Sequence, residues 1–207
     1  MDRALKRLYR LDSLLCAEDF LMTRPSSGAT IANGNLKGAL YVKSSENDVS
    51  LGIYLSAPVR RKLTVFPKGL ASEWPHDILE AYTVALEEVS HFHCLLHHTT
   101  EGRQVSPLDL ELQGEIDKFL VTFFTNNDQK NAANFERLYV RLFQEFSLSS
   151  DLSALQRERY LEANRLAMRF IRRHEALLLQ SDSAFALARL RKFYRMSGRE
   201  KIRIISY

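Results

Sequence analysis

Apolar side chains recur in steps of three and four residues through most of the chain after residue 75, which is the spacing of amphipathic helices. The clearest run covers about residues 77–98, and the next covers about residues 106–125. Three further runs follow it, at 135–146, 153–180 and 183–196. The pattern predicts five helices joined by short loops, which favours neighbouring and mostly antiparallel packing.

Residues with capping chemistry stand where these helices are expected to begin. The predicted capping pairs are Asp77 with Glu80, Ser106 with Asp109, and Ser153 with Gln156. Pro107 strengthens the second start, because proline suits the first position of a helix. Gly198 predicts a C-terminal cap for the helix over 183–196, and the tail that follows is open between strand and helix.

The N-terminal part of the chain has a different pattern. Residues 2–16 predict an amphipathic helix or two helical pieces, and the turn-rich stretch 25–38 predicts a loop. Residues 37–43 and 49–56 are rich in strand formers and predict a β-hairpin, followed by a short helix after Ser56. An isolated hairpin is marginal, so this one is expected to pack on helices or to pair elsewhere.

These elements predict a mainly α fold: a helical bundle of about five helices with an N-terminal β-hairpin appended. Residues 1–74 would form the helix and hairpin subregion and residues 75–207 the bundle, within one compact domain. The chain has 207 residues, of which 45% are apolar and 26% charged. A chain of this length can bury a hydrophobic core without disulfides or metal ions to stabilise it.

Composition argues against secretion and membrane insertion. No apolar run approaches the length of a membrane helix, and the charged start MDRALKRLYRLD lacks the apolar region of a signal peptide. The two cysteines, Cys16 and Cys94, are far apart and predict reduced thiols rather than a disulfide framework. A cytoplasmic protein with no membrane partner is therefore expected.

Charge is distributed unevenly along the chain. Residues 75–146 carry 12 acidic and 5 basic side chains, whereas residues 147–207 carry 13 basic and 6 acidic ones. The two segments either dock on each other or leave charged surfaces for a partner.

The basic C-terminal segment is a candidate surface for nucleic acid or for a protein partner, since cations neutralise phosphates and aromatic rings stack on bases. Arg60 and Arg61 would extend this surface if they folded nearby. The candidate residues are Arg189, Arg191, Lys192, Tyr194, Arg195, Arg199, Lys201, Arg203, Arg60 and Arg61.

One group of residues has the chemistry of a metal site. Glu88 and His91 form an E-x-x-H pair on one helix face, and Glu111 and Glu115 are one turn apart on the next helix. A tight helical hairpin would gather all four as half of a carboxylate-bridged metal site, although a second E-x-x-H helix is missing. The alternative is that Glu88 and Glu115 pair with basic groups of the C-terminal third.

No nucleophile elbow, Walker A loop, Rossmann glycine pattern or zinc spacing occurs in the chain. The sequence therefore favours a non-enzymatic cytoplasmic interaction protein, an adaptor or accessory subunit, with another protein as partner and no cofactor. Two alternatives remain open. One is a nucleic-acid-binding module that uses the basic C-terminal segment, and the other is a metal-dependent enzyme with a divalent ion at Glu88, His91, Glu111 and Glu115.

Overall fold

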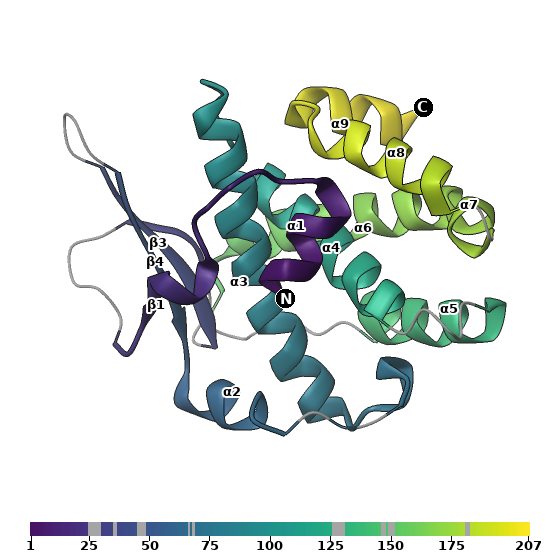
Figure 1. Ribbon diagram of the computed structural model, residues 1–207, viewed down its shortest axis with the longest axis horizontal. Coiled ribbons are helices and arrows are strands. Elements are labelled where there is room, and N and C mark those ends of the chain that lie inside the picture. Colours follow the sequence, from purple (N-terminus) through teal and green to yellow (C-terminus); the bar gives the residue numbers. More distant parts are fainter. Residues whose placement is uncertain are drawn as a thin grey trace.

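The computed structural model confirms a mainly α fold with a small β element (Figure 1). The residues it describes are 1–24, 30–34, 37–44, 49–65, 67, 69–125, 131–145, 148, 152–180 and 183–207. Within these residues the long helices form a bundle, and the sheet lies to one side of it.

The centre of the bundle is a helical hairpin of α3 (His76–Thr100) and α4 (Pro107–Thr125). Ser106 and Asp109 form the reciprocal cap predicted for α4, since each backbone N–H bonds to the other's side chain. α6 (Ala154–Arg173) packs along the other side of α4, and its predicted capping box of Ser153 and Gln156 is also present. α4 is therefore enclosed by other elements and is buried over most of its surface.

The aromatic end of the core lies between α4 and the next helical segment. α5 (Ala132–Tyr139) continues directly into a π-helical turn, Val140–Gln144, which together correspond to the predicted helix at 135–146. The rings packed here belong to Phe119, Phe123, Phe135, Tyr139 and Phe143. These ring contacts pack the C-terminal half of α4 against α5 and the π-helical turn.

The small sheet is larger than the predicted hairpin. Its strand order is β1-β4-β3-β2, and it covers one side of α3. β3 (Gly38–Ser44) and β4 (Val49–Leu55) form the predicted antiparallel hairpin. β1 (Leu21–Met22) adds a parallel edge, and β2 (Thr30–Gly34) pairs antiparallel with β3 inside the stretch predicted to be a loop.

The two ends of the chain meet on the bundle. α1 (Asp2–Tyr9) packs against α4 and α8 (Ser183–Tyr194), and α9 (Gly198–Ser206) packs against α6. The short α2 (Ala57–Lys62), predicted after Ser56, lies at the opposite end, beside the start of α3 (Figure 1). Cys16 and Cys94 are both free thiols, as predicted.

Besides the strand found in the predicted loop, three local predictions are wrong. Asp77 does not cap α3 but pairs with Lys62 of α2 at 3.2 Å, because the neighbouring helix offers a cation. The predicted helix 153–180 breaks at His174, where the short α7 (Glu175–Leu179) begins. Gly198 does not end α8 but begins α9, where a Cβ would collide with the Asp109 carboxylate.

Candidate functional site

The buried helix α4 carries polar side chains on two opposite faces, and each face meets a different group of residues. We call the first group the carboxylate–histidine cluster. It consists of Glu87, Glu88 and His91 from α3, Glu111, Glu115 and Lys118 from α4, and Arg159 from α6. We call the second group the tyrosine–lysine network, which consists of Tyr9, Ser90, Gln113, Asp117 and Lys201.

Helical spacing explains how the carboxylate–histidine cluster assembles. Glu87 and Glu88 precede His91 by four and three residues, so all three project from one side of α3. Glu111, Glu115 and Lys118 repeat in the same way on α4. Because α3 and α4 pack against each other, these two sides face one another in the interior.

Contacts within the cluster place His91 between carboxylates. Its Nδ1 lies 3.6 Å from Glu88 Oε2, and its Nε2 lies 3.9 Å from Glu111 Oε2. Glu111 also accepts a hydrogen bond from Arg159 Nε at 3.3 Å. The imidazole is fully enclosed, so its charge state depends on these neighbours rather than on solvent.

A lysine holds the other side of the cluster together. Lys118 Nζ lies 2.7 Å from Glu115 Oε1 and 3.0 Å from Glu87 Oε2. Burial opposes its charge, but the two carboxylates outweigh that effect and raise the pKa of Lys118 above its usual range. Lys118 therefore remains a cation in the interior.

The pKa values of several ionisable groups in the cluster are raised above their usual range. Burial raises the pKa of Glu88 to about 7, and it also raises the pKa of Glu115. Burial disfavours a charged His91, but Glu88, Glu111 and Glu87 together raise its pKa to about 9. Perturbed groups that share a buried site are typical of functional sites.

Three members of the cluster bring possible metal-donor atoms together. Donor atoms of Glu87, His91 and Glu111 all lie within 4.8 Å of one another. Gly114 of α4 makes room beside them, because a methyl group there would lie 2.9 Å from His91 Nε2 and 3.3 Å from Glu87 Cγ. Two carboxylates and one imidazole are donors that suit Zn²⁺, Mn²⁺ or Fe²⁺.

Two of the four predicted metal ligands do not belong to the group of converging donor atoms. His91 and Glu111 come together as expected, but Glu115 pairs with Lys118 and Glu88 lies on the Nδ1 side of His91. Glu87, which the sequence interpretation missed, completes the group of three, and its spacing of four residues from His91 was the available signal. The alternative prediction, that Glu88 and Glu115 pair with basic groups of the C-terminal third, is wrong. Glu88 pairs with His91 of α3, and Glu115 pairs with Lys118 of α4.

The carboxylates of the cluster outnumber its basic side chains by one. When every group is ionised, the four carboxylates exceed Lys118, Arg159 and a protonated His91 by one negative charge. Oε2 of Glu88 and Oε2 of Glu115 are buried and accept no hydrogen bond among the described residues. A divalent ion bound to a neutral His91 would bring the sum to zero.

The tyrosine–lysine network is built differently. Asp117 accepts hydrogen bonds from Tyr9, from Gln113 at 2.8 Å and from Ser90 at 2.6 Å. Lys201 of α9 donates to Gln113 Oε1 at 2.8 Å. Even so, burial raises the pKa of Asp117 to about 6. This network ties α1 and α9 to α3 and α4.

The basic C-terminal segment is not a continuous surface. Lys201 and Tyr194 are buried at about 1% exposure, so these two predicted contact residues are not available to a partner. Arg191 and Arg195 donate to main-chain oxygens of α1 and its cap, including Leu8 O and Tyr9 O. Arg189, Lys192, Arg199 and Arg203 remain exposed, while Arg60 and Arg61 lie on α2 at the opposite end of the molecule.

The acidic and basic segments pack directly on each other, since α4 lies along α6. Two ion pairs join them: Glu111 with Arg159 at 3.3 Å and Glu136 with Arg172 at 2.8 Å. Part of the opposite charge is therefore satisfied within the chain.

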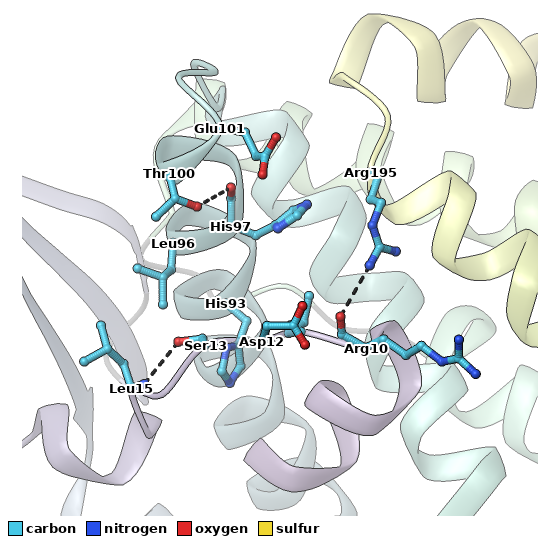
Figure 2. Close-up of a pocket in the computed structure, with 11 residues that line it drawn as sticks. Arg10, Asp12, Ser13, Leu15, His93, Leu96, His97, Thr100, Glu101 and Arg195 are labelled. Carbon is cyan, nitrogen blue, oxygen red and sulfur yellow. Dashed lines mark hydrogen bonds between the residues drawn. The ribbon is translucent and has the colours of Figure 1, made fainter.

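A surface pocket of about 470 Å³ lies between the segment after α1, the C-terminal half of α3 and Arg195 (Figure 2). Histidines 93 and 97 lie one turn apart along it, but His93 Nε2 is already 2.8 Å from Asp2 Oδ1. The charges that line the pocket are mixed, with Arg10 and Arg195 near Asp12 and Glu101. It lacks the concentrated donors of the carboxylate–histidine cluster.

Comparison with protein families, with curated proteins and with solved structures gives no match, so the site is interpreted from its own geometry. Among the residues that the structure describes, no helix combines the length and the apolar character needed to cross a membrane.

Proposed function

We propose that the protein binds a divalent metal ion in its helical core, with Glu87, His91 and Glu111 as ligands. The observation that carries this proposal is the convergence of their donor atoms to within 4.8 Å of one another in the interior. Burying this many ionisable groups costs folding free energy unless they are paired or hold a metal. The cluster also has four carboxylates and only three basic side chains, so a bound cation would offset the excess negative charge when every group is ionised.

The surroundings of His91 suit a metal ligand. Its Nε2 faces Glu111 and the space left by Gly114, and Glu88 lies on its Nδ1 side. A carboxylate this close to Nδ1 would favour a proton on that nitrogen and leave Nε2 as the coordinating atom. Glu88 would therefore act as a positioning residue rather than as a ligand.

The ligand set also indicates what the bound ion would do. Three protein ligands leave at least one coordination position for water, which is the pattern of reactive rather than closed structural sites. The cluster is almost fully enclosed, so it admits an ion or a small molecule and not a large substrate. The proposed function is metal binding at Glu87, His91 and Glu111, where the ion, when bound, would supply Lewis acidity.

A partner-binding role remains a prediction. The acidic and basic segments neutralise each other in part, and two of the predicted contact residues are buried. A protein or nucleic-acid partner would have to bind the predicted basic side chains that stay exposed in the C-terminal segment: Arg189, Lys192, Arg195, Arg199 and Arg203.

The experiment is a titration of chelator-stripped protein with Mn²⁺, Co²⁺ or Zn²⁺ by calorimetry, with elemental analysis after gel filtration. Glu111→Gln and His91→Gln should each weaken binding at least hundredfold, because each removes a ligand. Glu162→Gln is the matched control, since Glu162 is an exposed glutamate paired with Arg165. Binding weaker than about 100 µM, or equally strong in Glu111→Gln, would refute the proposal.

Gly114→Ala tests the same site without removing a donor atom. Alanine ordinarily stabilises a helix interior relative to glycine by up to about 1 kcal/mol. Here the new methyl group would crowd His91 Nε2 and Glu87. A folded Gly114→Ala protein should therefore bind the metal at least tenfold more weakly than the parent.

A further inference from the structure

The Lys118 ammonium group occupies a position that resembles a cation site. It lies between two carboxylates from different helices, 2.7 Å from Glu115 Oε1 and 3.0 Å from Glu87 Oε2. Glu87 is shared, because it also belongs to the group of three ligands with His91 and Glu111. Lys118 therefore lies next to the proposed metal ion, across a common carboxylate.

The two carboxylates around Lys118 offer more acceptor oxygens than the lysine binds. Glu115 is about 2% exposed, and its Oε2 accepts no hydrogen bond among the described residues. In sites that hold two metal ions, the ions lie about 3.5–4 Å apart. Carboxylates placed like those around Lys118 can bind both ions of such a pair. The side chain that fills this space is a lysine, which supplies one positive charge and no ligand atom while it stays protonated.

We propose that Lys118 takes the place of a second metal ion, so that the cluster binds one divalent ion rather than two. This inference rests on the proposed function. Glu115 is then the counterion of Lys118 and not a ligand of the first ion. Removing both the charge and the bulk of Lys118 would open a second site between Glu87 and Glu115.

The test compares Lys118→Ala with Lys118→Arg in the full chain, using Mn²⁺ as the probe. Bound Mn²⁺ is counted by elemental analysis after gel filtration, and electron paramagnetic resonance reports whether two ions are close enough to couple. The parent protein and Lys118→Arg, which keeps the cation, should each bind one ion. Lys118→Ala should bind two ions with a spin-coupled spectrum.

Each outcome separates this inference from the proposed function. A parent protein that binds no Mn²⁺ refutes the metal-binding function itself. A parent that binds one ion, with a Lys118→Ala variant that also binds only one, refutes the role of Lys118 alone. Two ions in the parent or in Lys118→Arg also refute it, as does a second ion in Lys118→Ala that does not couple to the first.

Glu115→Gln provides an independent test if the Lys118 variants fail to fold. It keeps the shape of the side chain and removes the counterion of Lys118. Because Glu115 is not assigned as a ligand of the first ion, this variant should still bind one Mn²⁺, with an affinity within tenfold of the parent. A loss as large as that of Glu111→Gln would make Glu115 a ligand and contradict the assignment.

Discussion

The two polar groups on α4 are equally buried but are completed in different ways. In the tyrosine–lysine network both oxygens of Asp117 accept hydrogen bonds, and Lys201 donates to Gln113. In the carboxylate–histidine cluster, carboxylates outnumber cations, and two buried oxygens accept no hydrogen bond among the described residues. A fully hydrogen-bonded network of buried groups specifies packing. The proposed metal site rests instead on the excess of carboxylates and the converging donor atoms of the cluster.

The tyrosine–lysine network and the carboxylate–histidine cluster also differ in their position in the fold. The network joins the ends of the chain to the central hairpin, since Tyr9 lies on α1 and Lys201 on α9. The cluster lies between the long helices α3, α4 and α6, which position side chains more rigidly than loops do. We therefore expect changes in the network to affect stability and changes in the cluster to affect metal binding.

The largest expected effect is that of the metal on stability. Free metal at about a thousand times its dissociation constant should raise the free energy of unfolding by about 4 kcal/mol, because only the folded chain presents the site. For a chain of this size that corresponds to a Tm increase of roughly 8–16 °C. Thermal melts with and without metal measure it, and chelator should reverse it. An identical increase in Glu111→Gln would mean that the ion binds elsewhere.

Lys201→Met should have the next largest effect, and on stability alone. It removes a buried cation and leaves Gln113 Oε1 without its donor, which should cost about 3 kcal/mol in urea denaturation. Metal affinity should remain within threefold of the parent. A stability loss below about 1 kcal/mol would mean that the network does not support the fold.

Asp117 gives the network a pH dependence with a defined sign. Its pKa is about 6 in the folded protein, against 3.8 for an unperturbed aspartate, so between these pH values the folded state retains a proton that the unfolded state loses. The contribution of Asp117 to stability therefore falls as pH rises from about 4 to about 6, by up to about 3 kcal/mol. The difference in unfolding free energy between the parent and Asp117→Asn across this range isolates the effect. A difference that does not change with pH would contradict it.

Glu88→Gln should have the smallest effect of the four. It keeps all three proposed ligands but weakens the group beside His91 Nδ1, so metal affinity should fall 10- to 100-fold, or roughly 2 kcal/mol. A competition titration against a chelating dye measures it. No change would show that Glu88 does not position His91, and a loss equal to that of Glu111→Gln would make Glu88 a ligand.

Helix periodicity predicted the elements that build the site better than it predicted the partners of each side chain. The α3–α4 hairpin follows from local spacing, and so does the meeting of His91 with Glu111. Glu87 was missed because the E-x-x-H pattern favours the three-residue spacing of Glu88, while the four-residue spacing of Glu87 fits the same face. A local pattern therefore locates a site more reliably than it chooses among adjacent ligands.

Long-range pairing of charges could not be predicted from the sequence. Lys201 lies in a run of basic residues that predicts a surface, but α9 turns it inward toward Gln113. In the same way, Asp77 has the spacing of a helix cap but pairs with Lys62 of α2. Which charges face inward depends on how distant helices pack, and this information is not contained in local spacing.

The most direct test of the central claim is an anomalous-scattering map from a crystal of the protein grown with Mn²⁺ or Zn²⁺. The account predicts one strong peak at about 2.0–2.3 Å from His91 Nε2 and from a carboxylate oxygen of both Glu87 and Glu111, with Lys118 still between Glu87 and Glu115. A map with no peak among these three side chains, from a crystal soaked at saturating metal, would contradict it.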